Sequence, residues 1–283
     1  MNDSEVLIEG RDGITVVTLN RPDKLNRLSA AVQEGILQGL KSSLENGSRV
    51  IVIKGSGRAF STGYDLDVES RGRKAYLSLG DINDDRAGLQ RAATTWLAVR
   101  RHPIPVVTQV HGYCLAGGTD LMLASDIAIA ADDAIIGMPN TRSLGVTLML
   151  PALVWACGSM RSKLMAFTGD SISGRVAAAW SLVALSVPAD ELDKTVAELA
   201  ERIARVPVEL LIAAKRTLNW THEAAGLEQA VSATVDIDAV AHFTAPVRSF
   251  WELARESGLK VALRGRDDPF DSGNFMRHFE DQE

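Results

Sequence analysis

The chain has 283 residues, of which 46% are hydrophobic and 23% charged, which fits one large globular domain, or one with an appendage, and excludes a disordered chain. Its 30 Lys and Arg against 36 Asp and Glu give a net charge of −6, which argues against a nucleic-acid binder with a dense basic surface. The N-terminus lacks the pattern of a secretion signal, and the longest apolar stretch, near 145–158, is interrupted by Pro151. We therefore expect a cytoplasmic protein with no nucleic-acid and no membrane partner.

Short runs rich in β-branched residues predict strands along the first half of the chain. They lie at residues 16–19, 50–53, 106–110 and 127–130, each bounded by Gly, Pro, Asp or charged residues. Helical patterns separate them, one from an N-cap at Ser29 to about Glu45 and one from about Ala87 to Arg101. The polar stretch 67–86 predicts a long, mobile or weakly helical connection. Alternating strands and helices indicate a mixed α/β layered fold.

After Pro188 the sequence becomes helical. We expect helices at 189–205, 207–221 and 227–243, followed by a tail from 246 to 263. The apolar faces of the first two have the spacing of core-packing stripes. The sequence thus divides into a core, residues 1–200, which carries the functional turns, and a helical region, residues 201–283.

Two glycine-containing turns follow predicted strands. One is Ala59-Phe60-Ser61-Thr62-Gly63-Tyr64-Asp65, and the other runs from His111 through Gly117-Gly118 to Asp120 and into a helix. Glycine lets the backbone approach a ligand closely, and N–H groups at such turns point outward without partners. Two such donors aimed at one carbonyl oxygen stabilise negative charge that develops there. This chemistry suits a thioester.

Four segments of the chain resemble the crotonase (enoyl-CoA hydratase/isomerase) superfamily, in that family's order. They are residues 19–26, 57–66, 110–120, and Thr168-Gly169-Asp170 with Gly174 and Ala177 after it. The resemblance implies a spiral of β-β-α repeats with a C-terminal helical region that assembles a homotrimer or hexamer. It also implies an enzyme acting on an acyl-CoA thioester, with coenzyme A as part of the substrate and no separate cofactor.

The resemblance also assigns site residues. The oxyanion donors would be the backbone N–H groups of Tyr64 and Gly117, and the phenol of Tyr64 receives no role. Asp120 and Asn140 stand where the family's hydratases carry two glutamates as acid and base. Aspartate has a shorter reach, and asparagine cannot exchange a proton at neutral pH. We therefore expect Asp120 to be the acid/base group, alone or through a water held by Asn140.

A few basic residues near the ligand entrance would suffice to hold the phosphates of an acyl-CoA. The candidates are Arg21, Lys24, Arg27 and Arg58, each of which also fits a solvated surface charge. Further candidates for substrate contact are Asp65, Leu66 and Arg142. Arg142 alternatively pairs with Asp126 inside the protein. His111 fits a buried, hydrogen-bonded histidine better than a general base.

Several alternatives stay open. The sequence between Pro139 and Pro151 departs from the usual hydratase pattern, which indicates a reshaped pocket wall. A catalytically weak or inactive acyl-CoA-binding protein, or an isomerase, hydrolase or decarboxylase of the same fold, is therefore a second interpretation. The chain has no complete dinucleotide fingerprint and no Gly-x-Ser-x-Gly elbow. Its two cysteines give neither a metal-ligand set nor a disulfide framework, so we expect no metal site.

Overall fold

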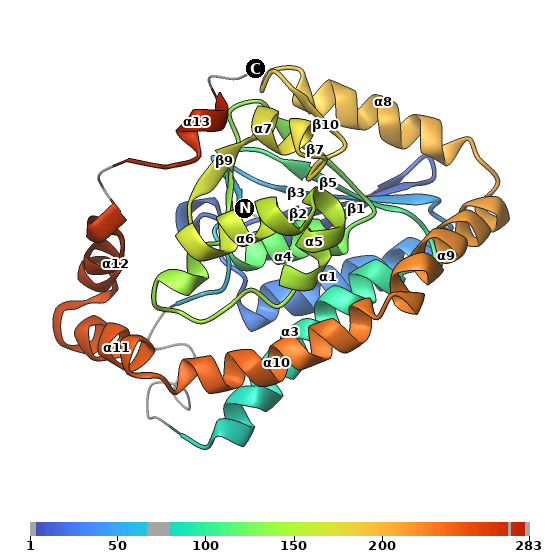
Figure 1. The fold of residues 1–283 in the computed structure, drawn as a ribbon. Coiled ribbons are helices and arrows are strands. Elements are labelled where there is room, and N and C mark those ends of the chain that lie inside the picture. Colours follow the sequence, from blue (N-terminus) through green and yellow to red (C-terminus); the bar gives the residue numbers. More distant parts are fainter. Residues whose placement is uncertain (1–3, 67–79, 271–272, 281–283) are drawn as a thin grey trace.

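The structure, a computed structural model, describes residues 4–66, 80–270 and 273–280. Its larger sheet has the strand order β1-β2-β3-β5-β7-β10, in which β1 and β2 are antiparallel and the other neighbours are parallel (Figure 1). These strands are β1 (Val6–Arg11), β2 (Ile14–Leu19), β3 (Val50–Gly55), β5 (Val106–Val110), β7 (Ile127–Ala131) and β10 (Leu185–Val187). All four predicted strands are confirmed within this sheet.

A second, four-stranded sheet follows the order β4-β6-β8-β9 and carries the functional turns at its strand ends. Its strands are short: β4 (Ala59–Ser61), β6 (Tyr113–Leu115), β8 (Ile135–Gly137) and β9 (Ser171–Ser173). Because β4, β6 and β8 are parallel, their carboxyl ends lie at one edge. The segments that leave these three strands are therefore brought together.

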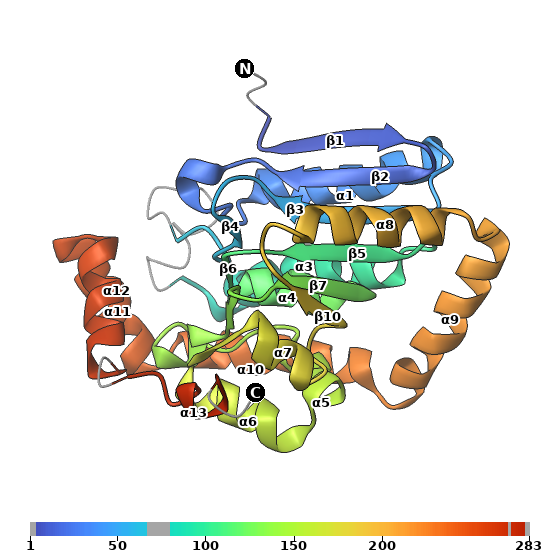
Figure 2. The ribbon, with the colours of Figure 1, turned by 90° about the horizontal axis from the view of Figure 1, so that it is seen from above.

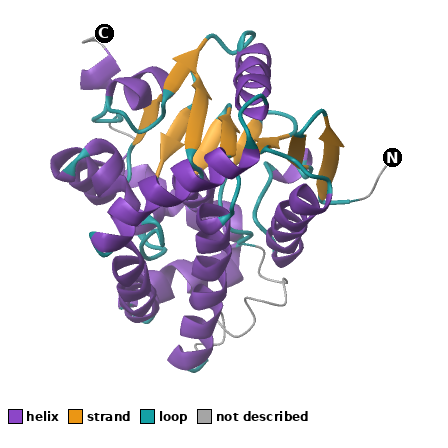
Figure 3. Ribbon diagram, turned by 90° about the vertical axis from the view of Figure 1, so that its right-hand side faces the viewer, coloured by secondary structure: helices purple, strands orange, loops and turns teal. Residues whose placement is uncertain are grey.

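Helices cover both faces of the larger sheet. Helix α1 (Ala30–Glu45) contacts β1, β2 and β3, while α8 (Leu192–Ala204) contacts β2, β3, β5 and β7 from the other face (Figure 2). Residues 50–53 of β3 are all buried for this reason, which is why their sequence is continuously apolar. Figure 3 shows that most of the helices gather on one side of the strands. The mixed α/β class is confirmed.

The remaining helices complete the core and its surroundings. They are α3 (Ile82–Arg101), α4 (Gly117–Ala124), α5 (Leu150–Cys157), α6 (Ser159–Thr168), α7 (Gly174–Ala179), α9 (Val208–Ala224), α10 (Leu227–His242), α11 (Ala245–Ser257), α12 (Leu259–Asp267) and α13 (Arg277–Glu280). Short 3₁₀ turns occur at η1 (Pro22–Lys24), η2 (Pro139–Arg142) and η3 (Asp268–Phe270). In the described ranges, no helix combines the length and the apolar character needed to cross a membrane.

The helix ends follow local capping chemistry. The Ser29 hydroxyl accepts a hydrogen bond from the Val32 N–H at 3.1 Å, which confirms the predicted N-cap of α1. Helix α3 begins earlier than predicted because the Asp81 carboxylate accepts from the Asn83 N–H at 2.8 Å. Of the predicted mobile or weakly helical connection over 67–86, residues 82–86 are the first turn of α3, and residues 67–79 lie outside the described residues.

The C-terminal helices fall into two groups. Helix α10 lies along α3 and adds Leu227, Val231 and Val235 to the main core. Helices α11 and α12, which replace the predicted tail, pack on each other around a small separate apolar cluster. Figure 1 shows this pair at the opposite end of the molecule from α9. The division into residues 1–200 and 201–283 stays a prediction.

Candidate active site

The two glycine-containing turns touch each other. We call residues 59–66 and 111–120 together the turn pair. Gly63 has φ +92°, and a Cβ built there would lie 2.8 Å from the Ala116 Cβ and 3.0 Å from the Gly117 nitrogen. Only glycine fits both the backbone conformation and the space. The turn after β4 is therefore packed directly against the start of α4.

Two backbone N–H groups are left without protein acceptors at this contact. Gly117 is the first residue of α4, so its N–H has no acceptor within the helix. Ala116, just before it, has φ 54° and ψ −118°, a conformation that is uncommon for a residue other than glycine. In the described parts of the chain, neither the Tyr64 N–H nor the Gly117 N–H donates to a protein atom. Both donors are free for a ligand.

Asn26 fixes the first turn from the side. Its amide donates to the Ser56 carbonyl at 2.9 Å and to the Ala59 carbonyl at 2.7 Å. The Ser61 hydroxyl in turn donates to the Asn26 carbonyl at 2.8 Å. Asn26 is fully buried, so these bonds are shielded from water. The segment 19–26, noted in the sequence for its family resemblance, thus holds the turn that carries Tyr64.

Asp120 lies in the first turn of α4 and is completely buried. Its Oδ1 accepts from the Met149 N–H at 2.7 Å, and its Oδ2 accepts from the Tyr64 hydroxyl at 3.3 Å. Burial raises the pKa of Asp120 to about 7, although the hydrogen bonds from Met149 and Tyr64 oppose this rise. Both protonation states of the Asp120 carboxyl are therefore accessible near neutral pH.

The phenol of Tyr64 has two polar contacts that the sequence did not predict. Besides its bond to Asp120, its oxygen accepts from the Trp96 indole N–H at 2.8 Å. Trp96, on α3, is completely buried. Burial and the neighbouring Asp120 charge raise the pKa of Tyr64 well above its ordinary value, so the phenol stays protonated.

Asn140 lies in η2, which follows β8 at the edge of the turn pair. The Gly137 carbonyl at the end of β8 accepts from the Ala116 N–H at 3.0 Å and from the Thr119 hydroxyl at 2.9 Å. This junction places the segment after β8 beside the start of α4. The side-chain Oδ1 of Asn140 is buried and has no hydrogen-bond partner among the described residues. A buried acceptor in this state is unusual and is suited to a ligand or a water.

The segment 139–151, which we call the wall, is held by buried carboxylates from two helices. Besides the bond from Met149 to Asp120, the Val146 N–H donates to Asp238 Oδ1 on α10 at 2.7 Å. Gly145 has φ +104°, and a Cβ there would lie 2.3 Å from the same oxygen. Burial raises the pKa of Asp238 to about 6, while His242 opposes the rise.

His242 completes the anchor of the wall. Its Nε2 lies 3.3 Å from Asp238 Oδ1, and its Nδ1 lies 2.9 Å from Asp85 Oδ2 on α3. The imidazole thus joins α10 to α3 behind the wall. The sequence predicted the helix at 227–243 but gave His242 no role.

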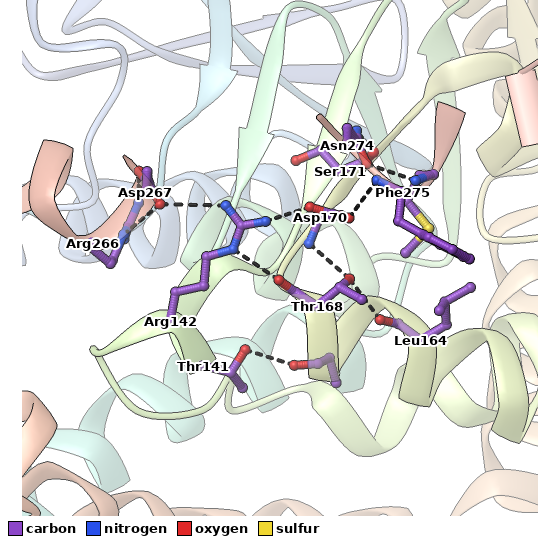
Figure 4. A network of polar contacts seen from close by, with 12 residues as sticks. Thr141, Arg142, Leu164, Thr168, Asp170, Ser171, Arg266, Asp267, Asn274 and Phe275 are labelled. Carbon is purple, nitrogen blue, oxygen red and sulfur yellow. Dashed lines mark hydrogen bonds and ion pairs between the residues drawn. The ribbon is translucent and has the colours of Figure 1, made fainter. Parts of the chain in front are cut away.

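Arg142 ties the wall to the C-terminal region (Figure 4). Its Nη2 lies 2.5 Å from Asp170 Oδ1, its Nη1 3.5 Å from Asp267 Oδ1, and its guanidinium carbon 3.9 Å from the Phe270 ring centre. The predicted pairing of Arg142 with Asp126 is wrong. Asp126 instead binds the Lys215 ammonium at 2.6 Å and the Val106 N–H at 2.7 Å, where β5 begins. Asp126 precedes β7 of the larger sheet, whereas Arg142 follows β8 of the smaller sheet.

The basic candidates around the first turn separate into buried and exposed groups. Arg21 is buried, and its Nη1 lies 2.9 Å from Asp65 Oδ2. Asp65 also faces Arg27, whose Nη1 lies 3.8 Å from Oδ1. Lys24 and Arg58 are exposed. The cations available to an outside ligand are therefore Lys24, Arg58 and the partly exposed Arg27.

Two further predicted residues have contacts of their own. Leu66 packs, together with Leu144 of the wall, against the apolar cluster of α11 and α12. His111 is only partly buried, so the prediction of a buried histidine is wrong, although its Nε2 lies 2.9 Å from the Gly57 carbonyl oxygen. No group of metal-ligating side chains occurs in the ranges that the structure describes, where Cys114 and Cys157 are buried free thiols.

Known proteins share this architecture. The family Enoyl-CoA hydratase/isomerase matches residues 9–251. The chain is 32% identical to the Mevalonyl-coenzyme A hydratase sidH of Aspergillus fumigatus, covering 84% of this chain and 88% of that protein. It is 30% identical to the Hydroxycinnamoyl-CoA hydratase-lyase of Pseudomonas fluorescens, covering 76% and 80%. The crystal structure of an enoyl-CoA hydratase from Mycobacterium smegmatis superposes with a TM-score of 0.88 at 33% identity, covering 94% of each chain.

The family match includes both segments of the turn pair, and the superposition covers nearly all of the chain. The molecule has the crotonase fold, as the sequence predicted. The chain belongs to the enoyl-CoA hydratase/isomerase family.

Proposed function

We propose that the protein processes acyl-CoA thioesters by stabilising an enolate between the N–H groups of Tyr64 and Gly117. The observation that carries this proposal is the contact of Gly63 with the Gly117 nitrogen, which brings two donors without protein acceptors side by side. Donors fixed in this way need no reorganisation as negative charge develops on the thioester oxygen. The membership in the family supports the same assignment.

We assign the proton transfer to Asp120, acting alone or through a water held by Asn140. Its pKa of about 7 makes both protonation states available near neutral pH, which is the condition for an effective acid/base group. The unpartnered Oδ1 of Asn140 supports a role for Asn140 in holding a water or a substrate carbonyl. The reaction we favour is hydration or isomerisation of an enoyl-CoA, in line with the hydratase names of the relatives.

We further propose that Lys24, Arg27 and Arg58 hold the phosphates of coenzyme A, which belongs to the substrate, with no separate cofactor. Asp65 and Arg21 would then keep Arg27 in place through their ion pairs. Leu66 would border the acyl group. Arg142 would contribute indirectly, because its bonds hold the wall that carries Asn140.

We propose a homotrimer or hexamer that assembles through the C-terminal helices, in the cytoplasm. Large apolar side chains that are exposed on the single chain support such an assembly. On α9 and α10 they are Leu210, Leu218, Trp220, Ile237 and Val240. Burying them against another subunit would remove an apolar surface that single-chain proteins seldom expose.

A second candidate is a catalytically weak acyl-CoA-binding protein, or an isomerase, hydrolase or decarboxylase of the same fold. The observation that favours it is the amide at position 140, which leaves the site with one carboxylate in place of two. Turnover of a panel of enoyl-, hydroxyacyl- and β-dicarbonyl-CoA substrates separates these candidates. Binding of acyl-CoA without turnover of any panel member would exclude the enzyme.

Asp120→Asn tests the acid/base assignment. The variant keeps the shape of the side chain, so the affinity for acyl-CoA should change little while kcat falls by about 100-fold. An unchanged kcat would contradict the assignment. Asn140→Glu is the complementary variant, since a second carboxylate should raise crotonyl-CoA hydration if its absence limits the reaction.

A further inference from the structure

Tyr64 contributes to both the proposed oxyanion donors and the surroundings of Asp120. The backbone N–H of Tyr64 donates to no protein atom among the described residues, whereas its side chain reaches Asp120 on α4. The ring lies over Gly117, because a Cβ built on that glycine would be 2.9 Å from Tyr64 Cε2. Tyr64 therefore spans the distance between the proposed oxyanion donors and the acid/base carboxylate.

The direction of the hydrogen bonds follows from the chemistry of the donors. An indole N–H can only donate, so the Tyr64 oxygen accepts from Trp96 at 2.8 Å. The phenolic proton is then left for the Asp120 Oδ2 at 3.3 Å. Because the Met149 N–H already occupies Oδ1, both oxygens of Asp120 have a fixed donor. The carboxylate can neither rotate nor lose one bond without leaving a buried group unpaired.

We propose that Tyr64, held by Trp96, is a positioning residue for Asp120 that fixes the orientation of its carboxylate. This inference rests on the proposed acid/base role of Asp120. It adds a side-chain function to a residue whose backbone alone was assigned one.

The surroundings of Asp120 determine what the Tyr64 hydroxyl can change. The titratable groups that face Asp120 are Tyr64 itself, Asp238 on α10 and Cys114 on β6. Burial and Asp238 raise the pKa of Asp120, while the hydrogen bonds from Met149 and Tyr64 lower it. Removing only the phenol hydroxyl should therefore raise the pKa of Asp120 further, because one donor to the ionised form is lost.

Tyr64→Phe is the decisive variant, since it keeps the ring and the backbone N–H. The pH midpoint of kcat that belongs to Asp120 should move upward by about one unit, whichever protonation state the reaction uses, while KM changes less than about twofold. Trp96→Phe should move the midpoint in the same direction by less, because the phenol loses its orientation but stays present. Trp180→Phe, at the end of α7 where the ring packs on Phe279, is the matched control for the tryptophan variant and should leave the profile unchanged.

A second measurement is independent of turnover. Carboxyl ¹³C NMR of aspartate-labelled protein, with the Asp120 signal identified from its absence in Asp120→Asn, should show the same upward movement in Tyr64→Phe. An Asp120 midpoint that is equal in folded Tyr64→Phe and wild type would overturn the inference. A wild type that turns over no acyl-CoA, with the NMR midpoint still moving in Tyr64→Phe, would count against the proposed function and leave the positioning of Asp120 intact.

Discussion

The turn pair and the wall enclose the same candidate site but are held in different ways. The turn pair is fixed by backbone geometry, with Gly63 packed against Ala116 and Gly117 and no charged side chain in the contact. The wall is fixed by side chains that come from elsewhere, namely Asp120, Asp238 and the partners of Arg142. The contact itself needs glycine at position 63, and the neutral hydrogen bonds of Asn26 hold the turn in place. The wall depends on ion pairs and buried hydrogen bonds, so its position can change with charge and pH.

Gly117→Pro would test the backbone half of this comparison and should have the largest effect. Proline removes the N–H, and loss of one oxyanion donor lowers turnover by about 100-fold or more. Gly117→Ala is the control, because it keeps the donor while its Cβ crowds the Tyr64 ring. A folded Gly117→Pro variant with full kcat would show that this N–H is not an oxyanion donor.

Arg142→Met would test the charged half. It leaves the buried Asp170 carboxylate without its partner, so unfolding free energy should fall by about 3 kcal/mol. The control is Arg175→Met, whose arginine is 61% exposed and 3.7 Å from Asp132, and which should cost less than about 0.5 kcal/mol. Urea unfolding of both variants measures the difference. Equal losses would mean that Arg142 is not the anchor of the wall.

Asp120 belongs to the turn pair and accepts a hydrogen bond from Met149 of the wall. Its raised pKa makes the stability of the protein depend on pH. A carboxyl whose pKa is raised to about 7 in the folded state favours folding in its protonated form, so its contribution is lost as pH rises toward that value. Between pH 5 and pH 8, the stability of Asp120→Asn should therefore rise by about 2.6 kcal/mol relative to that of the wild type. Unfolding measured at both pH values gives this number. A difference that is constant with pH would contradict the raised pKa.

Asp267→Asn should have the smallest effect. Asp267 is 39% exposed and lies 3.5 Å from Arg142, whereas Asp170, on the same guanidinium, is buried. The variant also weakens the contact of Asp267 with Arg266, whose Nη2 lies 2.7 Å from Oδ2. Because water screens Asp267, the loss of both contacts should cost only about 1 kcal/mol. A loss as large as that of Arg142→Met would place the main anchor of the wall on the C-terminal side.

The same distinction explains what the sequence could predict. The strands, the N-cap at Ser29 and the turn pair depend on local composition and on glycine, and their positions follow from short stretches of sequence. The contact of Tyr64 with Trp96 and the partners of Arg142 depend on which elements meet in space. Trp96 lies on the buried face of α3, where a tryptophan has the pattern of an ordinary core residue.

One wrong prediction and one contact that was not predicted have the same origin. Arg142 and Asp126 are close enough in sequence to invite pairing, yet the chain passes from one sheet to the other between them. Asp238 and His242 have the i, i+4 spacing of one helical face, which a sequence can show, but only the structure reveals the Val146 N–H that they hold. The roles assigned to Tyr64, Gly117, Asp120 and Asn140 stay predictions until the variants are measured.

The hydrogen bond between Val146 and Asp238 also determines when the wall can be anchored during synthesis of the chain. Chains emerge from the ribosome N-terminus first, and these two residues are 92 positions apart. A nascent chain that stops before Leu227 already contains every strand of both sheets, but it has neither Asp238 nor His242. Its wall therefore has no anchor on α10, and its main core lacks Leu227, Val231 and Val235. During biosynthesis, the wall can therefore be anchored only after α10 has been translated and has packed on α3.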